Sequence, residues 1–357
     1  MTLTKRLIRT PSVFGEEKEI GEFIASQLSK EDVILQEVPG FPPNVIARKM
    51  SSDDVPTVVL NGHMDTVRPL SSWEQDPYKP RIKGNMLHGL GASDMKGGLA
   101  VLMNAFRNVE NERVNLVFVA TVDEEGICSG AHTFVKEYDG DFCLVGEPSR
   151  EKIILRARGR YVLEIVVEGK VAHGARPREG TNAIEDMAKV VASLKKVKTR
   201  KHRSMGSGSV TPLEIRAGEG SLTLPEICRM VVDRHIVLGE TQKMILEDFR
   251  NVLGKLKVGS KIRVSLVGRK TPFLEPYVTD SRNAYVRKFI QTFGSEYQRD
   301  PEISYAQSVG DYNVFGGLMP TLIFGPIGIG SHTSQERLDV RSLYRCERTL
   351  TRFLNSL

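Results

Sequence analysis

Short apolar runs alternate with amphipathic stretches along the first 150 residues of the chain. The runs at 57–60, 114–120 and 142–145 have the character of buried strands, each bounded by Gly, Asp or Asn. Apolar residues recur at helical spacing over 20–28, and a further helix is predicted from Ser93 to about residue 109. Strands that alternate with helices predict a layered α/β domain with a mixed, largely parallel sheet. Such sheets bind ligands in the loops beyond the carboxyl ends of their strands.

The pattern changes from about residue 156. The predicted elements then run strand, helix, strand, strand, helix, strand, at 161–168, 181–196, 213–216, 227–238, 241–255 and 261–267. This order is that of the ferredoxin-like α+β unit. We therefore predict an inserted domain at 156–269, between the two parts of the first domain at 1–155 and 270–357.

Length and composition limit the classes of protein to which the chain can belong. At 357 residues the chain is long enough for two domains, and 40% apolar with 26% charged residues describes a globular protein. No run approaches the ~18 apolar residues of a membrane span, and the N-terminus lacks a hydrophobic signal core. The cysteines are scattered without a CxxC pair, which indicates reduced thiols. We expect a cytoplasmic protein without a membrane partner.

Charge gives little reason to expect a nucleic-acid partner. The net charge of +6 is compatible with an anionic substrate without requiring one. The basic run at 195–203 has no interleaved aromatic residues, and it follows a predicted helix, whose C-terminal dipole favours cations. We interpret it as a solvated edge and predict no nucleic-acid binding.

Histidines and carboxylates follow the predicted strands. His63 and Asp65 come directly after the strand at 57–60, and their spacing places both side chains on one face, where the carboxylate can orient the imidazole. Asp94 lies in a glycine-rich turn at a helix start. The remaining candidates follow later strands or a glycine-rich loop: Glu124, Glu125, Glu147 and His332.

Each candidate alone is weak, because Asp94 could simply cap its helix and an isolated histidine is usually structural. The joint pattern is more informative. Carboxylates placed repeatedly after buried strands repel one another unless a cation lies among them. A mixed set of histidines and carboxylates suits zinc, cobalt or manganese better than calcium or magnesium.

These segments resemble the co-catalytic zinc metallopeptidase family of glutamate carboxypeptidase, acetylornithine deacetylase, succinyl-diaminopimelate desuccinylase and aminoacylase. The matching motifs keep the family's order and spacing and span essentially the whole chain. They are GHMD at 62–65, GASDMKGG at 91–98, DEEG at 123–126, GEP at 146–148, HGARP at 173–177 with GTNAI at 180–184, and HT at 332–333.

The resemblance implies two divalent metal ions, expected to be zinc with cobalt or manganese able to substitute. Asp94 would bridge the ions, His63 and Glu147 would complete one site, and Glu125 and His332 the other. Glu124 would be the general base and Asp65 the residue that holds His63. Such a centre activates a water whose proton Glu124 removes, for attack on an amide or peptide carbonyl. The implied substrate is small and carries a free carboxylate.

The inserted domain resembles the family's lid and dimerisation domain, which implies a homodimer. His173 would reach the partner's active site and help to stabilise the oxyanion. The chain departs from the family in that Leu222 replaces a common Asn, Leu90 replaces a common Arg, and His235 ends a motif that usually ends in Arg. Candidates for binding the substrate carboxylate are Arg234 and Arg216.

Three functions stay open at this point. The first is hydrolysis of an N-acyl amino acid, as in a deacetylase or desuccinylase. The second is removal of a terminal residue from short peptides, as in a carboxypeptidase or dipeptidase. The third, a binding or dimerisation protein without catalysis, is disfavoured because every metal and base position is filled.

Overall fold

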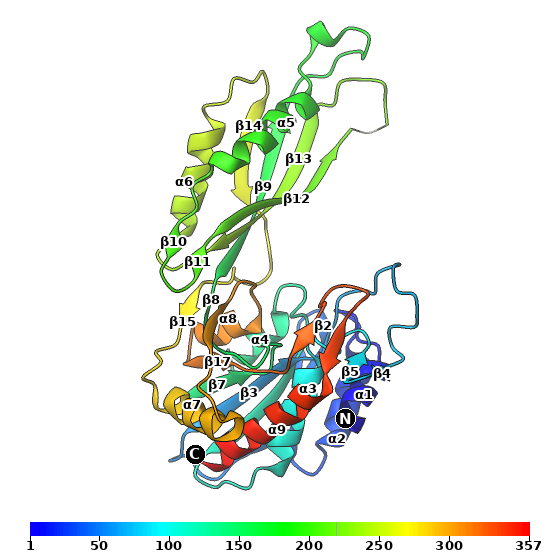
Figure 1. The fold of residues 1–357 in the computed structure, drawn as a ribbon. Helices are drawn as coiled ribbons and strands as arrows, with labels where there is room; N and C mark the ends of the chain where they lie inside the picture. The colour runs from blue at the N-terminus through cyan, green and yellow to red at the C-terminus, as the bar shows by residue number, and fades with distance from the viewer. Residues whose placement is uncertain (219) are drawn as a thin grey trace. The chain divides into compact units, whose positions relative to one another are not determined.

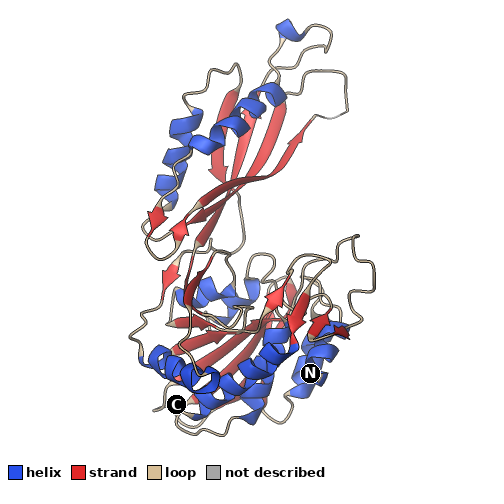
Figure 2. Cartoon of the chain, in the orientation of Figure 1, coloured by secondary structure: helices blue, strands red, loops and turns tan. Residues whose placement is uncertain are grey.

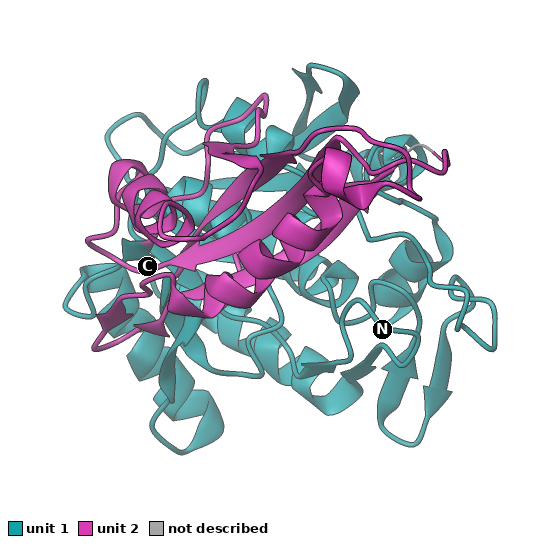
Figure 3. Ribbon diagram, turned by 90° about the horizontal axis from the view of Figure 1, so that it is seen from above, with its two compact units in different colours: residues 1–157, 277–306, 310–357 teal, residues 158–276, 307–309 magenta. Residues whose placement is uncertain are grey.

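The computed structural model describes residues 1–218 and 220–357, and the chain divides into two compact units (Figure 1, Figure 3). Unit 1 comprises Met1–Ala157, Tyr277–Ala306 and Gly310–Leu357, and unit 2 comprises Arg158–Pro276 and Gln307–Val309. The insertion thus begins at residue 158 rather than 156 and continues to 276 rather than 269. Its later end reflects the pairing of Leu274 with Arg160 inside unit 2.

A mixed sheet forms the centre of unit 1. Its strands are β1 (Asp32–Val38), β2 (Phe41–Lys49), β3 (Thr57–His63), β6 (Asn115–Thr121), β7 (Phe142–Val145), β8 (Ile153–Ala157), β15 (Tyr277–Val278), β16 (Ile303–Ala306) and β17 (Thr321–Ile323). The order is β1-β2-β6-β3-β7-β17-β8-β15, with β16 beside β8. The four central strands β6, β3, β7 and β17 run parallel, which confirms the predicted α/β class.

Most helices of unit 1 share one large core with its central sheet (Figure 2). The helices are α1 (Thr2–Arg9), α2 (Lys18–Gln27), α3 (Lys96–Asn108), α4 (Ser129–Phe134), α7 (Ala284–Tyr297), α8 (Asp311–Gly316) and α9 (Val340–Asn355). Every residue of β6 is buried, as expected for a strand covered on both faces. Phe289 packs edge-on against Phe353 with ring centroids 5.0 Å apart, and so joins α7 to α9.

A second, small sheet of unit 1 was not predicted. It contains β4 (Arg81–Lys83), β5 (Met86–His88), β18 (Gly328–Ile329) and β19 (Arg337–Asp339), in the order β18-β19-β5-β4. Strands of two or three residues are too short to show an apolar period. Their pairing matters for the site, because β19 lies against β5 and so fixes the chain after His332 beside the chain that leads to Asp94.

Unit 2 has the predicted order of elements: β9 (Gly159–Glu168), α5 (Ala183–Ser193), β12 (Ser209–Ala217), β13 (Ile227–Ile236), α6 (Gln242–Leu253) and β14 (Lys261–Leu266). Short additions are η1 (Pro177–Glu179), η2 (Leu194–Lys196), β10 (Lys201–His202) and β11 (Gly206–Ser207). The sheet order is β12-β13-β9-β14. Alternate residues of β9, such as Leu163 and Ile165, join Val190 of α5 and Phe249 of α6 in a separate core.

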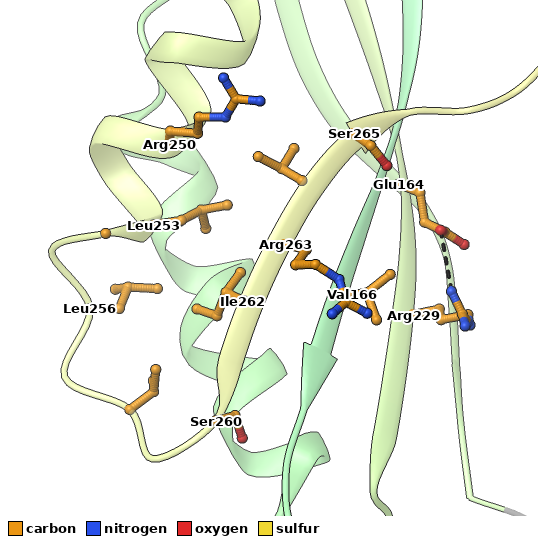
Figure 4. A pocket seen from close by; sticks show the side chains of 13 residues that line it. Glu164, Val166, Arg229, Arg250, Leu253, Leu256, Ser260, Ile262, Arg263 and Ser265 are labelled. Atoms are coloured by element: carbon orange, nitrogen blue, oxygen red, sulfur yellow. Dashed lines mark hydrogen bonds and ion pairs between the residues drawn. The ribbon is translucent and has the colours of Figure 1, made fainter.

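A groove of about 790 Å³ follows the edge strand β14 of unit 2 (Figure 4). Leu253 and Leu256 line one side of it, and the Arg229–Glu164 ion pair lines the other. None of the predicted site residues lines this groove.

Two further expectations concern surfaces and thiols. Along the described stretches, no helix combines the length and the apolar character needed to cross a lipid bilayer. All four cysteines are buried thiols: Cys143, Cys228 and Cys346 lie on β7, β13 and α9, and Cys128 directly precedes α4.

Candidate active site

His63 and Asp65 emerge at the carboxyl edge of the central parallel strands and are both buried. His63 is the last residue of β3 and lies opposite Thr121, the last residue of β6. The Nδ1–H group of His63 donates to the backbone oxygen of Asp65 at 3.0 Å, and Oδ1 of Asp65 lies 3.4 Å from the same nitrogen. The main-chain oxygen is therefore a closer partner than the predicted carboxylate. Either contact leaves the Nε2 lone pair of His63 available to a ligand.

Asp94 lies between the two candidate histidines. Its Oδ1 is 3.2 Å from Nε2 of His63, and its Oδ2 is 3.5 Å from Nε2 of His332. The turn that carries Asp94 joins β5 to α3, and the Asp94–Met95 peptide bond is cis. Presenting one oxygen to each side is what a carboxylate shared by two cations requires.

Two further carboxylates complete two groups of candidate ligands. Oε1 of Glu147 lies 3.6 Å from Nε2 of His63, and Oε1 of Glu125 lies 3.0 Å from Nε2 of His332. Within each group, the candidate ligand atoms lie within 4.8 Å of one another. The groups are His63–Asp94–Glu147 and Asp94–Glu125–His332, the same two sets that the family resemblance implies for the two ions.

A third group combines His63 with Glu124 and Glu125, so the predicted base lies among the same residues. Oε2 of Glu124 is 3.9 Å from Nε2 of His63. Glu124 and Glu125 belong to the turn after β6, in which Asp123 has a positive φ of 60°. This turn sends the two adjacent carboxylates in different directions, Glu125 toward His332 and Glu124 toward His63.

The site concentrates negative charge in a poorly hydrated place. Burial is the largest cause that raises the pKa values of Glu124, Glu125 and Glu147, and repulsion from neighbouring carboxylates adds to it. Hydrogen bonds to Asp94 and Glu125 raise the pKa of His332 to about 10. Cations among these groups would relieve the repulsion, so the residues present fit a pair of divalent ions.

Two residues beside Glu124 were not singled out from the sequence. Gly310 packs so closely against the base that a Cβ atom at this position would lie 2.1 Å from Oε1 of Glu124. Asp311 is buried next to it, and its Oδ2 accepts a hydrogen bond from the Thr121 hydroxyl at 2.6 Å. The sequence does contain a signal for these two residues, because Gly310 and Asp311 come a few residues after the strand at 303–306. The other candidate carboxylates were identified by the same position after a strand.

The remaining candidates belong to unit 2. His173 is exposed, and its Nδ1 accepts a hydrogen bond from the Ala175 N–H at 3.1 Å. The Gly174 N–H donates to the backbone oxygen of Leu222, a residue that is 89% exposed. The family departure at Leu222 therefore lies beside the segment that carries His173.

The two arginine candidates differ in exposure. Arg216 is exposed on β12 and forms an ion pair with Glu214. Arg234 is fully buried, and its guanidinium pairs with the buried Glu240. Because this pair already neutralises Arg234 inside unit 2, the structure argues against the predicted contact between Arg234 and a substrate carboxylate.

Known proteins resemble the chain over its whole length. A succinyl-diaminopimelate desuccinylase of Methylorubrum extorquens is 27% identical over 386 aligned residues, which cover 100% of this chain and 98% of the relative. The solved structure of a tripeptidase from Staphylococcus aureus superposes with a TM-score of 0.82 at 19% identity, covering 99% of this chain and 96% of that one. A Bacillus subtilis protein described as a dinuclear metal-binding peptidase superposes with a TM-score of 0.72 at 16% identity, covering 99% and 96%.

The family comparison agrees with the site. The model of peptidase family M20/M25/M40 matches residues 59–356, a span that runs from β3 to α9 and includes all the candidate ligands. This match extends over most of the chain, through both units. The chain therefore belongs to peptidase family M20/M25/M40, whose members hydrolyse carbon–nitrogen bonds.

Proposed function

We propose that this hydrolase cleaves the amide bond of a small N-acyl amino acid, in the manner of a desuccinylase or deacetylase, with two zinc ions. The observation that carries the proposal is the position of Asp94, with one carboxylate oxygen near each candidate histidine. The full-length similarity to a desuccinylase supports the class of substrate. Hydrolysis of short peptides is the alternative within the family.

Five side chains would hold the ions. Asp94 would be shared, His63 and Glu147 would complete one site, and Glu125 and His332 the other. Histidine nitrogen and carboxylate oxygen together form a donor set that zinc prefers, and that cobalt and manganese also accept. When bound, a pair of divalent ions lowers the pKa of a water and polarises the carbonyl that is attacked.

Glu124 would carry the proton. Its carboxylate takes the proton of the attacking water and returns it to the leaving amine, which a general base can do when it lies within hydrogen-bond reach of both. In the metal-free protein, burial raises the pKa of Glu124 well above its ordinary value. Asp65 holds the turn that carries Glu124 and so fixes the direction of this carboxylate.

Unit 2 would act as a lid and as the dimerisation domain, with His173 serving the partner's site. Support for a homodimer comes from β12, an edge strand whose residues 211–217 are exposed. Leu213 and Ile215 on this strand are 57% and 50% exposed. An exposed edge strand with apolar side chains is suited to pairing with a second strand.

A substrate panel combined with metal analysis tests the proposal. The apo protein is loaded with zinc, cobalt or manganese, its metal content is measured, and N-acetyl, N-succinyl and dipeptide substrates are compared by kcat/KM. We expect two ions per chain and the highest kcat/KM with an N-acyl amino acid. A preference for dipeptides would select the peptidase alternative. A metal content that stays at zero, without activity under any of these ions, would refute the two-metal proposal.

A further inference from the structure

Glu336 lies four residues after His332 and is almost completely buried, with 1% of its surface exposed. Its carboxylate faces the turn that carries Asp94. Oε2 accepts the N–H of Gly91 at 3.0 Å, and Oε1 accepts the N–H groups of Ser93 at 2.9 Å and Asp94 at 3.0 Å. One side chain thus accepts three backbone hydrogen bonds from a four-residue segment.

This arrangement depends on a carboxylate. Buried backbone N–H groups need acceptors, and consecutive N–H groups that point inward form a concave site for an anion. Gly91 allows the turn to curve in this way, because its φ is +75° and a Cβ atom there would lie 2.8 Å from Thr66. A neutral amide at position 336 would turn an NH₂ group toward at least one of these donors.

The same segment is tied to the chain around His332. The hydroxyl groups of Ser93 and Ser331 lie 2.9 Å apart, next to Asp94 on one side and His332 on the other. Arg337, which follows Glu336, pairs with His88 between β19 and β5. Glu336 is therefore a buried carboxylic side chain that connects the Asp94 turn to the segment after His332.

We propose that Glu336 is a positioning residue that fixes the carboxylate of Asp94 relative to His332, and that the affinity for both metal ions depends on it. The inference rests on the proposed two-metal function. Because Asp94 would be shared, displacing its turn weakens both ions together, whereas displacing His332 alone weakens one.

The test measures metal affinity rather than activity alone. Glu336→Gln keeps the size of the side chain and removes its charge. Glu296→Gln is the matched control, because Glu296 is a carboxylate with a 6% exposed side chain that pairs with Arg348 and Arg352 away from the candidate ligands. For wild type and both variants, zinc and cobalt binding constants are measured by competition with a chromophoric chelator, and the absorption spectrum of the cobalt form is recorded. Circular dichroism and thermal unfolding of the apo proteins report folding.

We expect Glu336→Gln to lower both binding constants by about 10–100-fold, the usual effect of removing an outer-shell partner of a metal ligand, and to change the cobalt spectrum. Glu296→Gln should lose stability while keeping both constants and the spectrum. Wild-type constants in a folded Glu336→Gln, or loss of only one ion, would overturn the inference while leaving the two-metal function intact. A wild-type protein that binds no metal would instead refute the proposed function itself, and the inference with it.

If Glu336→Gln does not fold, Ser331→Ala tests whether metal affinity depends on the connection between the Asp94 turn and the His332 loop. It removes the contact between Ser331 and Ser93, which joins the turn held by Glu336 to the loop that carries His332, so we expect metal affinity to fall by about threefold to tenfold, as for one hydrogen bond. Unchanged constants in Ser331→Ala would then count against a coupling between the two segments.

Discussion

Oδ2 of Asp65 accepts the backbone N–H of Glu125 at 3.0 Å. Its other oxygen accepts the N–H of Glu124 at 3.2 Å and lies 3.4 Å from Nδ1 of His63. One fully buried carboxylate thus holds both the end of β3 and the turn after β6, which together carry a candidate ligand from each metal group and the candidate base. The sequence motif that contains His63 and Asp65 predicts the contact between Asp65 and His63. It gives no sign of the hydrogen bonds from the Glu124 and Glu125 N–H groups.

Replacing Asp65 should therefore affect more than His63. In Asp65→Asn, the amide can accept only through one oxygen, and its NH₂ group opposes an N–H donor. We expect metal affinity or kcat/KM to fall by about 10–100-fold. Metal titration and initial rates measure this. Asp141→Asn is the control, because the exposed Asp141 accepts the N–H of Thr57 at the opposite end of β3. Equal effects of the two substitutions would count against a special role of Asp65.

Substitutions of the adjacent Glu124 and Glu125 should have different effects on turnover and metal content. Glu124→Ala should lower kcat by about 10²–10⁴-fold while the metal content stays near that of wild type, because it removes a proton acceptor and no ligand. Glu125→Ala should lose metal instead. Elemental analysis alongside steady-state kinetics distinguishes them. If Glu124→Ala loses metal and Glu125→Ala retains it, the two roles have been assigned the wrong way round.

Gly310 should be intolerant of a side chain. In Gly310→Ala, the new Cβ would lie 2.1 Å from Oε1 of Glu124, so the base must move. We expect kcat to fall by about 10–100-fold, part of the full contribution of a general base, with metal content retained. The control is Gly317→Ala in the same segment, because a Cβ there meets its nearest atom at 3.5 Å. Comparable kcat values in the two variants would show that Glu124 has room to adjust.

Much of the fold could be predicted because several strands of the central sheet contain continuous apolar runs. The run at 142–145 matches β7 residue for residue, and the order of elements in unit 2 follows from clear changes of period. The small sheet could not be predicted, because β18 and β19 contain two and three residues. Its strands are defined by pairing with distant chain segments, and a local apolar pattern contains no such information.

The candidate ligands could be found because each follows a strand or a glycine-rich loop. The supporting contacts of Glu336 and Gly310 could not be predicted, since they join segments that lie 180 residues or more apart in the sequence. Arg234 shows the opposite case. The family resemblance makes it a candidate for binding the substrate carboxylate because it lies in the motif that ends at His235, whereas its ion-pair partner Glu240 lies six residues further along the chain and is buried with it.

Glu17 should contribute to the pH dependence of the stability of the apo protein. Burial raises the pKa of Glu17 from 4.5 to about 7, and its Oε1 accepts the N–H groups of Gly15 and Asp123. The folded state therefore binds more protons than the unfolded state between pH 4.5 and 7. The free energy of unfolding therefore falls as the pH rises through this window. The destabilisation by the ionised Glu17 is complete above pH 7.

Glu17→Gln keeps the accepting oxygen and removes the charge, so it should remove the destabilisation that the ionised carboxylate causes. We expect the free energy of unfolding of the variant, relative to wild type, to increase by about 1–3 kcal/mol between pH 5 and pH 8. Urea unfolding of the metal-free proteins at both pH values measures the difference. A difference that is the same at pH 5 and pH 8 would exclude Glu17 as the titrating group.

Complementation between two inactive variants tests whether His173 acts in the active site of the partner subunit. If unit 2 forms a twofold dimer in which His173 serves the partner's site, His173→Ala and Glu124→Ala chains are each nearly inactive alone. In a heterodimer, one site combines an intact Glu124 with an intact His173 from the other chain, and the second site lacks both.

Random mixing makes about half of the dimers heterodimers, each with one working site, so activity should recover to roughly a quarter of wild type. Recovery cannot arise from either homodimer, because each lacks one of the two groups at both of its sites. Subunit exchange is verified separately with differently tagged chains. A control mixture of His173→Ala with the double variant His173→Ala/Glu124→Ala should stay inactive, because no chain in it supplies His173. If exchange occurs and the first mixture also stays inactive, His173 acts within its own chain or is merely structural.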